Sequence, residues 1–184
     1  SRVYSIESSG NLNGYHSADP DFKKNANDLS GTSTRIPIVW CTDFAAAFPS
    51  VSHEWLHIVL ESSGAPLWLR NFVKALYTDN HSYHLNLHGR SYLFTILAGV
   101  LQGCPLSATL FLLAIDPFLV AFMETLGYNV KGILRACADD LGFVLRDHRT
   151  LLELKGIFTM AESIAGLMLK PSKCCVVPLS RYYS

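Results

Sequence analysis

The sequence predicts an α+β fold, in which helices pack on one face of a split β-α-β sheet with antiparallel strands. Two observations support this prediction: short apolar, β-rich runs alternate with segments of helical period, and no internal repeat is visible. The 184 residues are 49% hydrophobic and 16% charged, which suits one domain with a sizeable core. The net charge is zero, so contact with nucleic acid would require local basic patches.

The first half of the chain divides into a lead-in followed by a strand, two helices and a hairpin. Residues 1–34 are rich in Ser, Gly, Asn and Asp and predict a loop-rich lead-in to a second region, residues 35–184. The apolar run 35–44, RIPIVWCTDF, predicts a buried strand that stops at Asp43. Helical spacing follows over 52–64 and 66–77. Residues 83–97 alternate around Gly89 and Arg90, which predicts a hairpin.

The second half opens with a glycine-containing loop, AGVLQGCPLS, and an apolar segment over residues 108–123. That segment is shorter than the roughly 20 residues that span a membrane, so we interpret it as a buried core helix. Asp116 and Pro117 either kink this helix or restart it, with Asp116 as N-cap. Two short strands over 133–145, an amphipathic helix over 150–166 and a strand-like end complete the order.

Cysteine usage predicts an intracellular protein. None of the five cysteines is spaced as C-x-x-C, and no signal-peptide pattern begins the chain. We therefore expect reduced, mostly buried thiols and a nuclear or cytoplasmic protein that is neither secreted nor membrane-bound. These cysteines are Cys41, Cys104, Cys137, Cys174 and Cys175.

Two adjacent aspartates interrupt the apolar stretch ILRACADDLGFVL. Asp139 and Asp140 suit a solvated turn, although an Asp-Asp pair is a poor choice for the left-handed conformations of a tight hairpin. Asp43 ends the other strongly apolar strand, so three carboxylates converge if the two strands are neighbours. Convergent carboxylates require cations, and hard oxygen ligands suit Mg²⁺. Two such ions about 4 Å apart support phosphoryl transfer.

Four segments in order resemble the motifs of reverse transcriptases. DFAAAF (43–48) resembles motif A, GVLQGCPLSATLF (99–111) motif B, CADD (137–140) motif C and GLMLKPSKC (166–174) motif D. Their order and spacing are similar to the palm of non-LTR (LINE-type) retrotransposon enzymes. The resemblance implies a reverse-transcriptase-like palm with motifs A to D over residues 35–184. It also implies incomplete fingers, of which residues 1–34 would be a remnant, and an absent thumb.

The resemblance assigns the metal chemistry to three carboxylates. It implies that Asp43, Asp139 and Asp140 are catalytic and bind two Mg²⁺ ions, with Mn²⁺ as a substitute. The implied activity is RNA-directed DNA polymerisation, with an RNA template, a DNA primer and dNTPs as partners. The rest of the retroelement protein, including fingers, thumb and an endonuclease in some elements, would be a further partner.

The resemblance also assigns residues that contact the nucleotide and the template. Phe48 corresponds to the aromatic residue that excludes a 2′-hydroxyl. Gln102 and Gly103 would contact the template and the incoming nucleotide, and glycine permits close backbone approach. Lys173 corresponds to a motif D lysine near the leaving pyrophosphate.

Four positions depart from the family pattern. Pro49 stands where the family usually has Asp, Cys104 where motif B has Asp, Cys137 where motif C has Tyr, and Lys170 where motif D has Asn. None of these changes removes a metal ligand. They leave open an alternative, a catalytically inactive, decayed palm that at most binds nucleic acid.

A rival pattern lies in HEWLH, residues 53–57, which matches the H-E-x-x-H zinc motif of metalloproteases. On a helix His53 and His57 would share a face and Glu54 would act as the base. No third ligand follows at a suitable distance, and the aspartates would be left without a role.

Further candidates lie between motifs A and B. His84 and His88 would share one face of a strand in the hairpin and could bind a metal, although a solvated strand face is the simpler interpretation. Arg70, Lys74 and Arg90 could face a nucleic-acid backbone or serve only solubility.

Overall fold

The computed structural model describes residues 35–179 except His88, and the predicted lead-in over residues 1–34 lies outside this range. The described residues divide into two compact units. The sheet unit comprises 35–44, 121–157 and 169–179, and the hairpin unit comprises 45–120 and 158–168.

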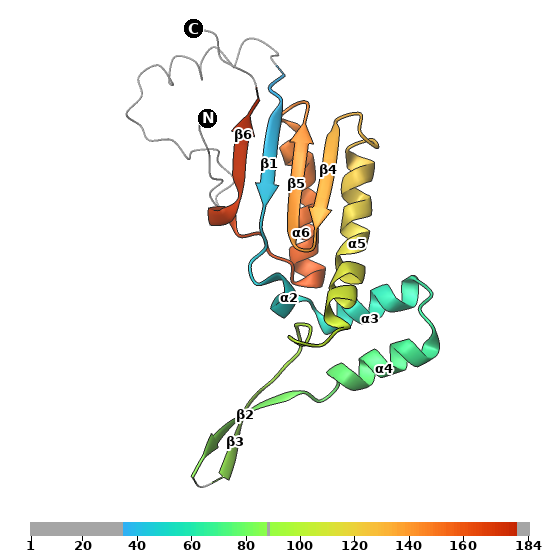
Figure 1. Ribbon diagram of the computed structural model, residues 1–184, viewed down its shortest axis with the longest axis vertical. Coiled ribbons are helices and arrows are strands. Elements are labelled where there is room, and N and C mark those ends of the chain that lie inside the picture. The colour runs from blue at the N-terminus through green and yellow to red at the C-terminus, as the bar shows by residue number, and fades with distance from the viewer. Residues whose placement is uncertain (1–34, 88, 180–184) are drawn as a thin grey trace. The chain divides into compact units, whose positions relative to one another are not determined.

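The sheet unit is built on four strands in the order β4-β5-β1-β6, and every neighbouring pair is antiparallel (Figure 1). The strands are β1 (Ile38–Thr42), β4 (Gly132–Cys137), β5 (Asp140–Leu145) and β6 (Cys175–Pro178). A short 3₁₀ turn, η1 (Pro171–Lys173), precedes β6. This arrangement confirms the predicted α+β fold with an antiparallel sheet.

One face of this sheet forms the core of the unit. Burial alternates along β1 and β5, as expected for strands with one covered face. Phe143 on β5 stacks against Trp40 on β1 at 5.1 Å between ring centroids and meets Phe122 edge-on at 5.3 Å. Phe122 belongs to the last turns of α5 (Ser107–Thr125), and the first half of α6 (Thr150–Ala165) lies behind the sheet (Figure 1). The opposite face exposes Cys41 and Arg135.

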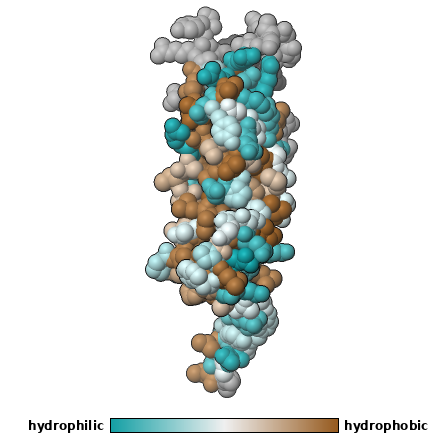
Figure 2. Space-filling model, turned by 90° about the vertical axis from the view of Figure 1, so that its right-hand side faces the viewer, coloured by the Kyte–Doolittle hydropathy of each residue, from teal (hydrophilic) through white to brown (hydrophobic). Residues whose placement is uncertain are grey.

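The hairpin unit contains α2 (Ala47–Ser50), α3 (His53–Ser62), α4 (Leu67–Tyr77) and the hairpin of β2 (His81–Asn86) and β3 (Gly89–Thr95). Ser52 caps α3, because its hydroxyl accepts a hydrogen bond from the Trp55 amide. Both predicted helices and the hairpin are confirmed. Figure 2 shows apolar and polar side chains together on the surface of the hairpin.

Helix α5 continues through Pro117, so of the two alternatives, a kink or a restart at Asp116, the restart is wrong. Apolar packing on one side stabilises the helix across the proline, since Phe111, Ala114 and Phe118 are all buried. The opposite side exposes Leu112 and other apolar residues, so α5 is a core helix on one face only. Among the described residues it is also the one helix long and apolar enough, by length and composition, to cross a membrane.

Candidate active site

Two neighbouring strands bring the three aspartates to one end of the sheet. β1 pairs with β5 in a register that sets Thr42 opposite Leu141. Continued by one residue, this register sets Asp43 opposite Asp140. The strands that carry the predicted carboxylates are therefore neighbours, which was the condition for their convergence.

The turn between β4 and β5 does not require either aspartate to adopt the left-handed backbone conformation. Cys137 pairs with Asp140, so Ala138 and Asp139 form the two-residue connection. Ala138 adopts the left-handed conformation, with φ at 52°. The aspartates themselves avoid it, which explains how an Asp-Asp pair is accommodated beside a tight turn.

Lys173 contacts the carboxylate of Asp43 directly. Its Nζ lies 2.7 Å from Asp43 Oδ2. Two backbone contacts position the segment that resembles motif D next to Asp43. The Lys170 amide donates a hydrogen bond to the Asp43 carbonyl oxygen at 2.9 Å, and Phe44 pairs with Leu169. The Sγ of the buried Cys174 also lies 4.0 Å from the Asp43 carbonyl oxygen. The β1 end and the motif D turn are thus joined around Asp43.

The three carboxylates act electrostatically on this one ammonium group. The hydrogen bond to Asp43 raises the pKa of Lys173 above its usual value, and the charge of Asp43 adds to it. The charges of Asp139 and Asp140 raise the same pKa further. Asp43 and Asp139 are half-buried and Asp140 is exposed, so solvent reaches the cluster.

The donor chemistry of this cluster fits a hard divalent cation, because its charges already favour one cation. Within residues 35–179 other than 88, however, no three His, Cys, Asp or Glu side chains are gathered closely enough to ligate a metal ion. In this arrangement Lys173 provides the positive charge at Asp43. A metal ion bound at Asp43 Oδ2 would therefore compete with Lys173 for that oxygen.

All five cysteines are free, as expected, but the prediction that most are buried is wrong. Cys174 is buried, whereas Cys41 and Cys137 are exposed, because they lie on the open face of the sheet or at its edge. Cys41 pairs with Cys175 across β1 and β6. Partial burial, the neighbouring Cys175 and the charge of Asp140 raise the pKa of the Cys41 thiol, so it stays protonated at neutral pH.

In the hairpin unit Phe48 is fixed by its ring and by its backbone. The ring stacks on Phe111 of α5, with centroids 4.4 Å apart and planes 15° from parallel. The Phe48 carbonyl oxygen accepts a hydrogen bond from the Val100 amide at 3.0 Å. The segments that resemble motifs A and B are thereby connected within this unit.

Gly99 is a structural requirement that the sequence reasoning missed. Its φ is 95°, and a Cβ at this position would lie 2.7 Å from the Pro49 carbonyl oxygen. Its amide also donates to the Val51 carbonyl oxygen at 2.7 Å. The signal was present in the sequence, since Gly99 opens the segment that resembles motif B, but only the close approach of residues 48–51 reveals its role.

Gln102 and Gly103 lie exposed in the loop before α5. Ser107 closes this loop, because its hydroxyl donates to the Leu101 carbonyl oxygen at 2.5 Å. Gly103 has φ at 82° and open space around it. The loop therefore presents both predicted contact residues to solvent.

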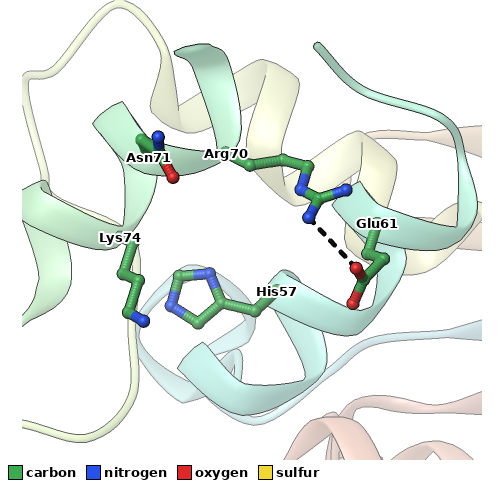
Figure 3. A pocket seen from close by; sticks show the side chains of 5 residues that line it. All are labelled: His57, Glu61, Arg70, Asn71 and Lys74. Atoms are coloured by element: carbon green, nitrogen blue, oxygen red, sulfur yellow. Dashed lines mark hydrogen bonds and ion pairs between the residues drawn. The ribbon is translucent and has the colours of Figure 1, made fainter. Parts of the chain in front are cut away.

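The first histidine of the zinc-like pattern has a structural role. The buried His53 hydrogen-bonds through Nε2 to the Gly99 carbonyl oxygen at 2.8 Å, and its ring packs on Tyr77 at 4.6 Å. His57 instead lines a pocket of about 270 Å³ between α3 and α4 with Glu61, Arg70, Asn71 and Lys74 (Figure 3). His53 thus packs against the segment that resembles motif B.

The other histidine pair lies in the hairpin. His88 lies outside the described residues, so its predicted pairing with His84 stays a prediction.

Residues 7–183 match the family described as reverse transcriptase (RNA-dependent DNA polymerase). The chain is 33% identical over 139 residues to a retrovirus-related Pol polyprotein from the type-2 retrotransposable element R2DM of Drosophila melanogaster, covering 73% of this chain and 13% of that protein. It is 37% identical over 91 residues to the corresponding polyprotein of the type-1 element R2 of Bradysia coprophila, covering 50% of this chain and 10% of that protein. The chain thus spans only a small part of these relatives.

Solved telomerase structures share the fold. Apo telomerase from Candida tropicalis matches with a TM-score of 0.62 at 13% identity, covering 89% of this chain and 32% of that one. Telomerase from Candida albicans, in complex with a TWJ fragment of telomeric RNA, matches with a TM-score of 0.59 at 15% identity, covering 91% and 31%. These likenesses confirm the predicted reverse-transcriptase-like fold. The family match and the two Pol polyproteins show that the chain belongs to the reverse transcriptase family, of the non-LTR retrotransposon type.

Proposed function

We propose that this chain is the palm region of a non-LTR retroelement RNA-directed DNA polymerase. The observation that carries the proposal is the pairing of β1 with β5, which brings the strand end before Asp43 beside the turn that carries Asp139 and Asp140. The partners would be an RNA template, a DNA primer, dNTPs and the rest of the retroelement protein. The proposed place of action is intracellular.

Asp43, Asp139 and Asp140 would hold two Mg²⁺ ions, or Mn²⁺ in their place. Such ions, when bound, stabilise the charge that develops on the attacking and leaving oxygens. In the proposed reaction the primer 3′-hydroxyl would lose its proton to solvent while its oxygen joins the α-phosphorus of a dNTP. The bond from that phosphorus to the oxygen of the β-phosphate would break, and pyrophosphate would leave. Lys173 would leave Asp43, and its ammonium would then be free to balance charge on the departing pyrophosphate.

Phe48 would select the sugar. Its ring is held flat against Phe111, so its position does not depend on the nucleotide. A fixed ring beneath the sugar would clash with a 2′-hydroxyl and favour deoxynucleotides. Phe48→Ala should therefore admit ribonucleotides in primer extension, and unchanged sugar discrimination would refute this role.

The main test is primer extension on an RNA template, with this region in its full-length protein. Mg²⁺-dependent cDNA should disappear in Asp139→Asn, because a metal ligand is lost. Asp116→Asn is a matched control, since Asp116 is an exposed aspartate on α5. Equal activity of the two variants would refute the assigned centre.

A second candidate is an inactive palm that binds nucleic acid only. The observation in its favour is Cys137, which lies exposed at the end of β4 where the family usually has an aromatic residue. A folded wild-type protein that binds template and yields no cDNA would support this candidate. Recovery of activity in Cys137→Tyr would then identify the lost group.

A further inference from the structure

The β2–β3 hairpin is exposed on both faces. Every described residue from His81 to Phe94 is exposed or only partly buried. Leu85 is 76% exposed and Tyr92 56%. A two-stranded ribbon of this kind is marginally stable alone, because it buries little apolar area. Its exposed aromatic residues therefore have no packing role in the core.

One face of the hairpin gathers aromatic and basic side chains. The strand register sets Tyr83 opposite Tyr92, His81 opposite Thr95 and Leu85 opposite Arg90. The two tyrosine rings lie 6.1 Å apart and 77° from parallel, and His81 lies 5.7 Å from Tyr92 at 73°. We call His81, Tyr83, Tyr92 and Arg90 the aromatic face.

Three side-chain contacts order this face. The Arg90 guanidinium lies 5.0 Å from the centre of the Tyr83 ring, which is within cation-π range. Tyr92 and His81 both contact the Thr95 hydroxyl, at 2.9 and 3.1 Å. The rings meet edge to face rather than in parallel stacks, so they are held in position without being stacked on one another.

The charge of the hairpin has one sign. Residues 81–95 contain Arg90 and three histidines but no Asp or Glu. In a chain of zero net charge this is a local region without negative charge. Phosphate is attracted to such a region, whereas an acidic residue would repel it.

We propose that the aromatic face binds single-stranded RNA outside the carboxylate centre. Exposed rings beside a basic group are what a single strand requires, because bases stack on rings and phosphates pair with cations. Tyr83 and Tyr92 would stack on bases and Arg90 would contact a phosphate. The choice of RNA over DNA rests on the proposed function, while binding itself rests on these side chains.

The test is fluorescence anisotropy of a labelled single-stranded RNA with the full chain. The double variant Tyr83→Ala/Tyr92→Ala should weaken binding about tenfold, since base-aromatic stacking is a major part of such affinity. Phe94→Ala is the matched control, because Phe94 pairs with Ser82 on the opposite face and is as exposed as Tyr92. An equal loss in Phe94→Ala, or no loss in the double variant, would overturn the proposal.

Misfolding of the hairpin must be distinguished from lost stacking. The conservative pair Tyr83→Phe/Tyr92→Phe keeps both rings and should keep the affinity. Arg90→Gln changes no ring and should weaken binding about threefold while reducing its salt dependence. If both of these variants bind as poorly as the alanine pair, the face acts through hairpin stability alone and the proposal is wrong.

Two further results separate this proposal from its alternatives. Asp139→Asn should abolish extension but leave RNA binding by the hairpin unchanged, so failure of one proposal is distinguishable from failure of the other. RNA affinity that is unchanged in the alanine pair, together with loss of a dimer, would assign the face to self-association. Tighter binding of single-stranded DNA than of RNA would contradict the choice of strand.

Discussion

Lys173 supplies a positive charge at Asp43, where the proposed function places a metal ion. Lys173 is largely exposed, and ion pairs that reach solvent are worth little free energy, so a competing cation can displace it. Lys173→Met should therefore raise the affinity of the centre for Mn²⁺ about threefold, because a competing cation is removed. Electron paramagnetic resonance of free Mn²⁺ measures this binding without turnover.

The same substitution should slow primer extension if Lys173 also balances charge on pyrophosphate. Mn²⁺ binding should become tighter while extension becomes slower, so competition for Asp43 can be distinguished from a role in catalysis. Lys155→Met is a suitable control, since Lys155 lies on α6 in the same unit. Weaker Mn²⁺ binding in Lys173→Met would contradict the competition.

Ala138 adopts a backbone conformation that costs an L-residue free energy. Its φ of 52° lies in the left-handed region, and glycine has no Cβ to clash there. Ala138→Gly should raise the free energy of unfolding by about 1 kcal/mol, after the greater entropy of an unfolded glycine is subtracted. Urea denaturation measures this change. Ala136→Gly, inside β4, should instead destabilise the protein.

At the scale of elements, the two histidines of α3 contact different parts of the hairpin unit. His53 packs inward against motif B, whereas His57 faces the pocket between α3 and α4. Burial lowers the pKa of His57 below its usual 6.5, and His53 and Lys74 lower it further. The unfolded chain therefore binds a proton at His57 more readily than the folded chain.

This difference predicts the direction of a pH dependence. Stability should fall as pH drops below 6.5 and should level off below the folded pKa, because protonation favours the unfolded state. Lys74→Met should raise the pKa of His57 in an NMR titration, since one positive neighbour is removed. In His57→Gln this part of the pH dependence should disappear. If the pKa of His57 in the wild-type protein were above 6.5, stability would instead rise as the pH drops, which would contradict this prediction.

Elements with a strong period or a sharp boundary could be predicted from the sequence. β1 ends close to Asp43, and the β4–β5 hairpin was expected from apolar runs on both sides of the aspartates. Pairing of β1 with β5 could only be stated as a condition, because strand register depends on partners distant in sequence. The Lys173 contact with Asp43 and the approach of Gly99 to Pro49 depend on the same long-range pairing. Local pattern alone could not supply them.

At the scale of the whole molecule, the net charge is zero, so the proposed affinity for RNA would depend on local basic groups. The candidate phosphate-binding groups are Arg90 on the hairpin and Arg70 and Lys74 on α4. Arg70 is already paired with Glu61 at 3.0 Å, so part of its charge is neutralised. Binding should therefore depend on salt less steeply than for a basic nucleic-acid protein.

The salt dependence measures how many of these groups contact phosphate. For three phosphate contacts, log affinity should fall against log salt with a slope of about −2. Arg90→Gln should make the slope shallower by about 0.7, and Glu61→Gln should make it steeper, because Arg70 is released. Anisotropy titrations over a range of KCl concentrations give these slopes. A slope near zero would show that stacking alone holds the strand, whereas one steeper than about −5 would require basic residues other than these three.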